Sequence, residues 1–376
     1  MVVGAGAVGA ACAYFLTRAG LAVHVVERGA IASGTSSACE GNLLVSDKEA
    51  GPELDLSLYS RTVWNHDLAE HGRKWEFEAK GGLVVVASEL GAQALSTLAT
   101  RQRAAGIEVD EVAGADLQRY EPHLSPSLAV GAFYPQDAQV QPMLLVAHLL
   151  RMARELGATV QTQTAVTGLL RDGDRVTGVE TSTGPVAAGA VVNAAGPWAR
   201  SIARLAGVEL PVLPRRGFVL VTQPLPLTVH HKVYAGEYVA NVLSSDEGLQ
   251  TAPVVGGTPS GTVLIGSSRE RVGFDRSVSL RVLTLLARQA VALFPVLRTA
   301  KAIRSYLGFR PYCPDHLPVI GQDRRAPGLW HAAGHEGAGI GLSVGTAKLL
   351  AQALVGTETD LDLSPFAPER FEHANV

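Results

Sequence analysis

The stretch MVVGAGAVGA, residues 1–10, decides the fold of the N-terminal part of the chain. Its valines precede Gly4-x-Gly6-x-x-Gly9, an alanine-rich apolar run follows, and a second apolar run ends at Glu27. This order predicts a strand, a tight glycine turn, a helix, a parallel strand and an acidic residue at the end of that strand. Such a unit is typical of domains that bind a dinucleotide.

The three glycines and the acidic residue each have a separate physical reason. Gly4 permits the turn, Gly6 lets the backbone approach a pyrophosphate, and Gly9 lets the helix pack closely on the sheet. The helix N-terminus then presents unpaired N–H groups and the positive end of its dipole to the phosphates. Glu27 stands where a carboxylate accepts hydrogen bonds from ribose hydroxyls. The alternative is a glycine-rich turn without a ligand.

The first strand is unusually short. Only three residues precede Gly4, whereas a strand usually has about five. Either this central strand is short, or the natural chain begins further upstream.

The composition bounds the class of protein. The chain has 376 residues, of which 47% are hydrophobic and 18% charged, so two domains with large cores are expected. A net charge of −3 without a basic run argues against binding to nucleic acid or to an anionic membrane. No apolar run reaches 18 residues and no signal peptide is evident, so we expect no transmembrane segment and a cytoplasmic protein.

The cysteines are few and widely spaced. Cys12, Cys39 and Cys313 form no C-x-x-C pair. A disulfide framework is therefore excluded, and no metal site is expected within this chain.

Strands and helices alternate through most of the chain, which predicts an α/β fold. Helices are expected over residues 54–72, 92–105, 142–156, 198–206, 280–294 and 342–354. Strands are expected over residues 82–87, 131–134, 160–164, 166–170, 176–181, 186–188, 191–196, 217–222, 233–242 and 261–267.

Two later segments bring backbone close to a ligand. Residues 191–198, VVNAAGPW, form an apolar strand ending in small residues, although a tight turn without a ligand explains them equally well. Residues 334–341, GHEGAGIG, precede a long helix, and their N–H groups with the helix dipole form an electropositive cradle. Such a cradle suits negative charge on a flavin ring. The alternatives are a second phosphate site or a capping loop.

A third segment supplies a cation. Arg310 lies in the apolar, proline-bounded stretch GFRPYCPDHLPVIG, residues 308–321. A buried guanidinium needs a partner, and a carboxylate bound through two hydrogen bonds is the natural one. The alternative is an internal salt bridge, for instance to Asp315.

Taken in order, these segments resemble the D-amino-acid oxidase family of FAD-dependent amine oxidoreductases. The similarity is greatest to the branch of glycine oxidase, hydrogen cyanide synthase and D-hydroxyproline dehydrogenase. It rests on the serine-rich loop at residues 33–37, on the CEGNLL segment that follows at residues 39–44, and on GHEGAGIG. The resemblance implies a discontinuous Rossmann-like FAD-binding domain and a mixed-sheet α+β substrate domain. The first would comprise residues 1–45, 140–210 and 308–376, and the second residues 46–139 and 211–307.

The resemblance also implies which residues hold FAD. Arg28 would flank the adenosine, residues 35–37 would reach the pyrophosphate or ribityl chain, and Val166 would meet the adenine through its backbone. The full set is Gly4, Gly6, Gly9, Glu27, Arg28, Thr35, Ser36, Ser37, Gly41, Asn42, Val166, Ala195, Gly196, Gly334, Gly337, Ala338, Gly339, Ile340 and Gly341. Sarcosine oxidase attaches its flavin through a cysteine whose place is taken here by Gly308, so we expect non-covalent FAD.

On the substrate side, Arg310 matches the arginine that holds the substrate carboxylate in the family. Tyr238 and Tyr306 are candidates for positioning the substrate, with ordinary structural tyrosines as the alternative. His335 is either a site residue or a structural histidine. Lys48 either assists oxygen near the flavin or is a solvated lysine, and the solvated lysine is the favoured interpretation.

The implied reaction oxidises the amine of a small amino acid, which would be a D-amino acid, glycine, or an N-substituted or cyclic amine, to an imine. Hydride would pass to flavin N5 in a mechanism that needs orientation of the substrate more than a protein base, and oxygen or an electron-accepting partner subunit would reoxidise the flavin. The chain would then work alone or in a homo- or hetero-oligomer. The alternatives are a flavin subunit that passes electrons to a partner and a nicotinamide-dependent dehydrogenase.

Overall fold

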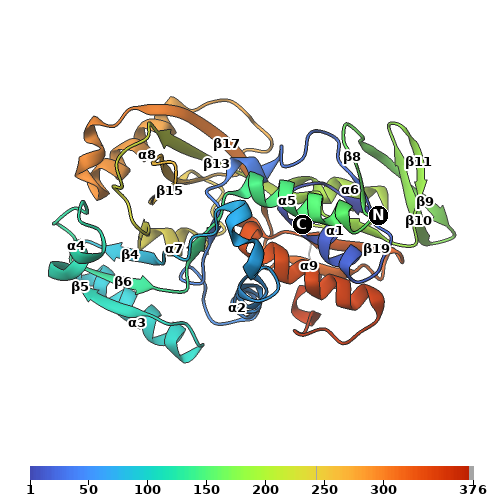
Figure 1. Cartoon of the computed structure of the whole chain (residues 1–376), viewed down its shortest axis with the longest axis horizontal. Coiled ribbons are helices and arrows are strands. Elements are labelled where there is room, and N and C mark those ends of the chain that lie inside the picture. Colours follow the sequence, from blue (N-terminus) through green and yellow to red (C-terminus); the bar gives the residue numbers. More distant parts are fainter. Residues whose placement is uncertain (243, 372–376) are drawn as a thin grey trace.

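The computed structural model describes residues 1–242 and 244–371. The two larger β-sheets lie side by side, as Figure 1 shows, with helices packed around them. The six-stranded sheet has the order β18-β19-β12-β1-β2-β8, and the eight-stranded sheet has the order β17-β13-β16-β15-β14-β4-β6-β5. The chain therefore has the mixed α/β architecture that its sequence predicts.

The six-stranded sheet is parallel except at one edge. Its central strand β1 pairs in parallel with both β2 and β12, β12 pairs in parallel with β19, and β18 is antiparallel to β19. The first strand, β1, contains two residues in this structure. The strands are β1 (Val2–Val3), β2 (His24–Val26), β8 (Thr159–Gln161), β12 (Val191–Asn193), β18 (Val319–Gln322) and β19 (Leu329–Ala333).

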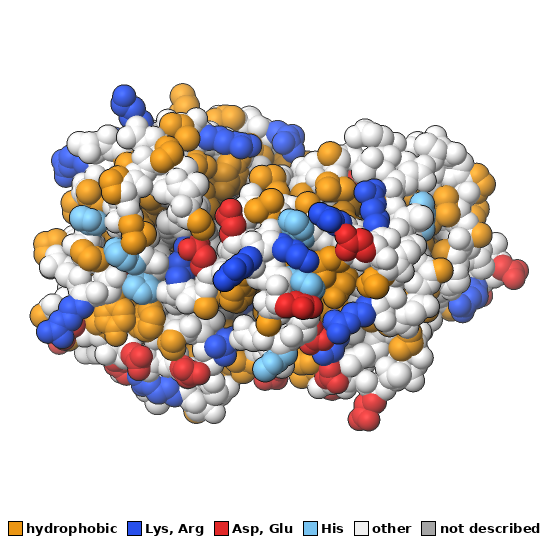
Figure 2. All heavy atoms as spheres, viewed as in Figure 1, with side chains coloured by type: hydrophobic (Ala, Val, Ile, Leu, Met, Phe, Trp, Pro, Cys, Tyr) orange, Lys and Arg blue, Asp and Glu red, His pale blue; other side chains and the backbone are white. Residues whose placement is uncertain are grey.

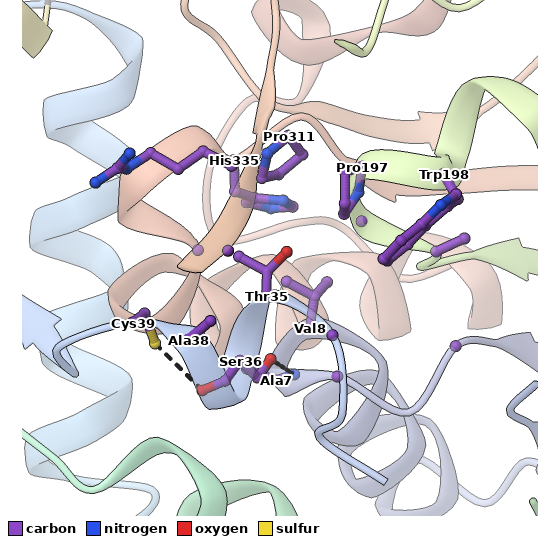
Figure 3. A pocket seen from close by; sticks show the side chains of 18 of the residues that line it. Ala7, Val8, Thr35, Ser36, Ala38, Cys39, Pro197, Trp198, Pro311 and His335 are labelled. Atoms are coloured by element: carbon purple, nitrogen blue, oxygen red, sulfur yellow. Dashed lines mark hydrogen bonds between the residues drawn. The ribbon is translucent and has the colours of Figure 1, made fainter. Parts of the chain in front are cut away.

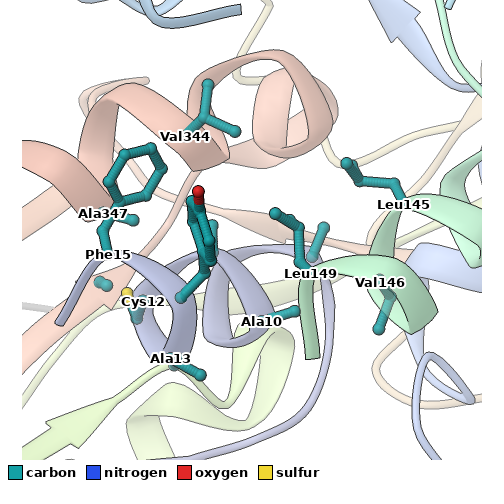
Figure 4. Close-up of a cluster of buried hydrophobic side chains, with 14 of the residues drawn as sticks. Ala10, Cys12, Ala13, Phe15, Leu145, Val146, Leu149, Val344 and Ala347 are labelled. Carbon is teal, nitrogen blue, oxygen red and sulfur yellow. The ribbon is translucent and has the colours of Figure 1, made fainter. Parts of the chain in front are cut away.

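Alternate residues of these strands face two different cores. Val2 and Val192 point into the core formed by α1 (Ala7–Arg18), α5 (Pro142–Glu155) and α9 (Gly339–Val355). Figure 4 shows this core, where the side chains of the three helices interdigitate; those labelled include Ala10, Ala13, Leu145, Leu149, Val344 and Ala347. The small residues of α1 let α9 approach closely.

The opposite face of the same sheet is covered by smaller elements. Val3 and Val191 pack there against α6 (Ala199–Leu205) and a three-stranded antiparallel sheet. That sheet consists of β9 (Val166–Asp172), β10 (Arg175–Thr181) and β11 (Gly184–Ala187). Both faces of the parallel sheet are thus buried, as such sheets require.

One helical segment, Glu336–Val355, is long and apolar enough by length and composition to cross a membrane. More than half of it is buried in the described structure, and α9 packs against α1 and α2 (Pro52–Asn65). We therefore assign its apolar character to the core of the fold.

The eight-stranded sheet is antiparallel apart from the parallel pair β14 and β4. Helix α8 (Leu280–Leu293) covers one face through Val282, Leu286 and Ala290, and α3 (Glu89–Ala104) lies in a second core on the other side. The strands are β4 (Gly82–Val86), β5 (Asp110–Ala113), β6 (Val130–Tyr134), β13 (Leu213–Thr222), β14 (Lys232–Ala235), β15 (Gln250–Gly257), β16 (Val263–Arg269) and β17 (Ala302–Tyr312). Short elements complete the chain: β3 (Asn42–Leu43), β7 (Ala138–Gln139), α4 (Leu117–Tyr120) and α7 (Glu237–Val242).

The structure corrects two predicted elements. The strand expected over residues 233–242 ends at Ala235, because the Gly236 carbonyl accepts a hydrogen bond from the Val239 amide at 3.1 Å and the chain turns into α7. The helix expected over residues 54–72 ends at Asn65 and is followed by a separate 3₁₀ turn. Strand β17 continues across residue 308, where the sequence places a domain limit.

Positive and negative side chains are interspersed on the face shown in Figure 2. Within the described ranges, no group of three or more His, Cys, Asp or Glu side chains is placed to hold a metal ion.

Candidate active site

A cavity of about 460 Å³ lies between the two sheets. The glycine turn after β1, the end of β2, the turn after β12 and the start of α9 line one part of it, and β13, β16 and β17 line another. Ligands of open α/β sheets bind at such carboxyl ends of parallel strands. Figure 3 shows the first part, with Thr35, Ser36 and Ala38 on one side and Pro197, Trp198, Pro311 and His335 around the rest.

The glycine turn leaves the N-terminus of α1 open. Gly4 has a φ of +105°, which favours glycine, and a Cβ on Gly9 would lie 1.9 Å from the Gly4 carbonyl oxygen. Gly6 caps the helix without a side-chain hydrogen bond, and the Ala7 amide donates to Ser36 Oγ at 2.9 Å. The bare backbone and positive helix end fit the pyrophosphate of a dinucleotide.

The acidic residue is held in place by the backbone. The Glu27 carboxylate accepts hydrogen bonds from the amides of Ala5 at 2.9 Å and Gly29 at 2.8 Å, and it lines the cavity. Arg28 stacks over Trp198, with 3.8 Å between its guanidinium carbon and the ring centroid. Trp198 was not predicted as a site residue, although it ends the quoted VVNAAGPW segment.

The serine-rich loop forms the 3₁₀ turn Thr35–Ala38 and connects the two sheets. Thr35 donates its hydroxyl to the Phe309 carbonyl of β17 at 2.6 Å. Thr35 and Ser36 line the cavity, whereas Ser37 bonds back to the Gly34 carbonyl and does not.

The structure brings most of the expected residues to this cavity. Those that line it are Gly4, Gly6, Glu27, Arg28, Thr35, Ser36, Gly41, Asn42, Val166, Ala195, Gly196, Tyr238, Arg310, Gly337, Gly339 and Ile340. Those that do not are Gly9, Ser37, Tyr306, Gly334, Ala338 and Gly341. Ala338 and Gly341 instead border a neighbouring cavity of about 80 Å³.

Arg310 reaches the cavity from β17 without a carboxylate partner. Its Nη1 donates to the Ser268 carbonyl at 2.8 Å, and no salt bridge joins it to any residue in the described ranges. Burial, together with nearby Arg269, lowers the pKa of its guanidinium. The alternative internal partner, Asp315, pairs with Arg370 at 2.6 Å instead. The guanidinium of Arg310 is therefore available to an anionic ligand.

The two candidate tyrosines differ. Tyr238 is buried on α7, lines the cavity and carries the Arg269 guanidinium 5.2 Å from its ring centroid. Tyr306 donates its hydroxyl to the Cys39 carbonyl at 3.3 Å and stays outside the lining. Burial raises the pKa of both phenols, so both are neutral at physiological pH.

Lys48 is not a solvated lysine, and that interpretation was wrong. Its side chain is 3% exposed, and its Nζ lies 3.0 Å from Asp47 and 3.2 Å from Glu53. Burial acts to lower the pKa of Lys48, but the two carboxylates together raise it. Lys48 lines the smaller cavity next to the main one.

His335 is buried beside the glycine loop. Its Nε2 lies 3.0 Å from Thr346 Oγ1 on α9, and burial lowers its pKa to about 3. The ring is therefore neutral in the folded protein at pH values where an exposed histidine becomes charged.

We expect the folded protein to lose stability in acid, because His335 is buried in its neutral form. Its folded pKa of about 3 lies below the ordinary 6.5, so the unfolded chain binds the extra proton and the free energy of unfolding falls as pH drops from 6.5 towards 3. This one group contributes a slope of up to about 1.4 kcal/mol per pH unit. His335→Gln should show a shallower slope in urea unfolding between pH 7 and 4.5, with FAD at a fixed concentration. Equal slopes in the two proteins would mean that His335 titrates normally.

Comparison with known proteins agrees with this geometry. The family model described as FAD dependent oxidoreductase (DAO) matches residues 1–353. The chain belongs to this family of FAD-dependent oxidoreductases. The DAO-family chain is 32% identical to the glycine oxidase of Geobacillus kaustophilus, over 98% of this chain and 96% of that protein. It is 28% identical to the hydrogen cyanide synthase subunit HcnC of Pseudomonas aeruginosa, over 99% and 96%.

Solved structures show the same relationship. The crystal structure of the Geobacillus kaustophilus glycine oxidase matches with a TM-score of 0.89 at 29% identity, covering 98% of this chain and 97% of that one. The L-proline dehydrogenase from P. horikoshii shares the fold, with a TM-score of 0.90 at 23% identity and coverage of 99% and 96%. Membership of an FAD-dependent family argues against the nicotinamide-dependent alternative.

Proposed function

We propose that this enzyme oxidises the amine of a small amino acid to an imine, with the substrate carboxylate held by Arg310. The observation that carries the proposal is the guanidinium of Arg310, which faces the cavity and has no carboxylate partner among the described residues. A buried cation of this kind requires an anionic ligand. A relative with 32% identity is named glycine oxidase, and glycine is a small amino acid.

Different residues of the chain have different roles in this reaction. Bound FAD supplies the hydride acceptor. Arg310 fixes the substrate carboxylate and so orients the Cα–H bond, which supplies much of the rate enhancement in reactions that depend on orientation. The open N-terminus of α9, with Gly337 and Gly339 on the cavity, stabilises negative charge there. Tyr238 adds its aromatic ring to the lining of the cavity. The imine product is then hydrolysed by water.

The direct test is anaerobic reduction of the bound flavin. Glycine, sarcosine, D-alanine, D-proline, L-proline and hydroxyproline are each mixed with the enzyme, and the absorbance near 450 nm is followed. We expect at least one of them to bleach the flavin. A flavin that none of these amino acids reduces would contradict the proposal.

Oxygen is proposed as the electron acceptor, because a single chain with its own flavin site needs no partner to complete a turnover. A second candidate is a flavin subunit that passes electrons to a partner, since one relative is named a synthase subunit. Stopped-flow reoxidation of the photoreduced enzyme separates the two. If air-saturated buffer reoxidises the flavin far more slowly than the enzyme turns over with an artificial dye, the partner-dependent reaction takes precedence.

We expect the FAD to be bound without a covalent bond. Cys39 lines the cavity, but burial raises the pKa of its thiol to about 11, so it is not a nucleophilic thiolate. Cys313 is buried, and burial raises the pKa of its thiol as well. After precipitation with acid, the yellow colour should stay in the supernatant and run as FAD in chromatography. Flavin that sediments with the polypeptide would show a covalent link.

A further inference from the structure

Glu40 and Lys232 form a buried ion pair beside the cavity. Neither residue has a role in the reaction as proposed above. Glu40 follows the serine-rich turn, lines the cavity and is 8% exposed. Lys232 begins β14, is 1% exposed, and places its Nζ 3.5 Å from Glu40 Oε2. The pair joins the loop after β2 to the eight-stranded sheet.

The two carboxylate oxygens of Glu40 have different surroundings. Oε2 accepts a hydrogen bond from Asn42 Nδ2 at 3.2 Å and faces Lys232. Oε1 accepts no hydrogen bond from the described residues and rests against β16, where a Cβ on Gly266 would lie 1.9 Å away. Glycine at this position therefore makes the room that Oε1 occupies.

Two further polar atoms of this cluster lack a hydrogen bond. Asn42 Oδ1 and Lys232 Nζ are both buried and form no hydrogen bond within the described structure. Buried polar atoms are almost always paired, so unpaired ones point to a ligand or ordered water. Asn42 also borders both cavities, which places the cluster where they meet.

The charges around Glu40 complement a zwitterion. Arg310 on β17 lines the same cavity, so a carboxylate and a guanidinium face one space. The other titratable neighbours of Glu40 are Lys232, Cys39, Tyr238 and Tyr306, and burial keeps the thiol and both phenols neutral. Burial lowers the pKa of Lys232 to about 8, against the opposing effect of Glu40, so Lys232 is largely charged at pH 7.

We propose that Glu40 is a catalytic residue that binds the ammonium group of the amino acid and accepts its proton, with Lys232 as the ion-pair partner that holds the Glu40 side chain in place. This inference rests on the proposed amino-acid oxidation. In the step, an N–H bond of the substrate breaks, an Oε1–H bond forms, and the electron pair of the N–H bond stays on nitrogen. The neutral amine then loses its Cα hydrogen with two electrons to FAD and becomes a protonated imine. The proton on Glu40 returns to solvent.

The competing explanation is that Glu40 only neutralises a buried lysine. Removing one member of such a pair is strongly destabilising, because it leaves an uncompensated buried charge, whereas replacing both is often neutral. Four proteins separate the two roles: the wild type, Glu40→Gln, Lys232→Met and the double variant. Glu121→Gln serves as a control, since Glu121 is a fully buried carboxylate outside the cavity.

Each protein is examined with FAD bound, by thermal unfolding and by ligand binding. The amine probes are glycine, sarcosine and L-proline, with Kd taken from the anaerobic flavin-reduction kinetics. The amine-free probes are acetate and cyclopentanecarboxylate, with Kd taken from the perturbation of the flavin spectrum. We expect Glu40→Gln to raise the Kd of the amine probe about tenfold or more, while the Kd of the amine-free probe changes less than about twofold.

The double variant gives the decisive result. We expect it to recover most of the thermal stability that the single variants lose and to keep the weakened binding of the amine probe. If it recovers both, or if Glu40→Gln binds and is reduced by the amine probe within twofold of the wild type, the catalytic role of Glu40 is overturned. If no amino acid reduces the wild-type flavin, the proposed function itself fails, which is a distinguishable outcome.

Discussion

Arg310→Met is expected to lower kcat/KM by roughly 30- to 150-fold while the protein keeps its FAD. Arg310 is the only member of the predicted substrate-binding set that brings a positive charge to the cavity, and removal of a charge-assisted, two-point contact costs about 2–3 kcal/mol. Methionine keeps an unbranched apolar stem and removes the guanidinium group, so the change tests the charged end of the side chain. Steady-state kinetics with the amino acid that bleaches the flavin gives the value.

The control for this variant lies on the same strand. Arg304 is exposed on β17, where its guanidinium lies 5.7 Å from the Tyr306 ring centroid, and it does not line the cavity. Arg304→Met should retain wild-type kcat/KM. A loss of less than about fivefold in Arg310→Met would place the carboxylate-binding group elsewhere in the cavity.

Gly9→Ala is expected to abolish FAD retention. The added Cβ would lie 1.9 Å from the Gly4 carbonyl oxygen. This oxygen belongs to the backbone and cannot rotate away as a side chain can, so α1 must move away from the glycine turn. Overpacking of this kind costs about 3 kcal/mol or more of unfolding free energy. The FAD content per polypeptide and urea unfolding of the purified variant measure the two effects.

Gly189→Ala is the matched control, because nothing lies within 4 Å of a Cβ at this exposed position. It should purify with a full complement of FAD. If Gly9→Ala also keeps its FAD and its stability, the close packing of α1 on the glycine turn is not needed for cofactor binding.

The parts of the fold with short-range signals were predictable from sequence. The spacing of Gly4, Gly6, Gly9 and Glu27 predicts the first βαβ unit within 27 residues. Each of these residues is required there for a local steric or hydrogen-bonding reason. The structure places β1, α1 and β2 there. The prediction of a strand that runs past Gly236 was wrong, because its end depends on contacts in the folded chain and not on a local sequence signal. Its apolar pattern suits a strand, and that pattern does not reveal the turn into α7, where the Gly236 carbonyl accepts from the Val239 amide.

The polar part of the site was only partly predictable. Arg310 stands out because an isolated arginine in an apolar, proline-bounded stretch is costly. Lys232 gives no such signal, since a lysine at the start of a strand is usually solvated, and its burial depends on Glu40 nearly 200 residues away. Lys48 was misread in the same way, because Asp47 and Glu53 become its partners only when the loop packs inside the fold.

The pairing of Asp315 with Arg370 shows the same limit. The sequence suggests Asp315 as a partner for Arg310, five positions away on the chain. In the structure, a segment near the C-terminus brings Arg370 to Asp315 and leaves Arg310 facing the cavity. Which of two cations a carboxylate meets is a tertiary property that spacing alone does not determine.

The most direct measurement of the central claim compares amino acids with the amines that lack their carboxylate. The enzyme with bound FAD is mixed without oxygen with glycine and methylamine, sarcosine and dimethylamine, or proline and pyrrolidine, and flavin absorbance is recorded over time. We expect at least one amino acid to reduce the flavin and its carboxylate-free counterpart to leave it oxidised on the same time scale. Equal reduction by both members of each reactive pair, or no reduction by any amino acid, would contradict the account.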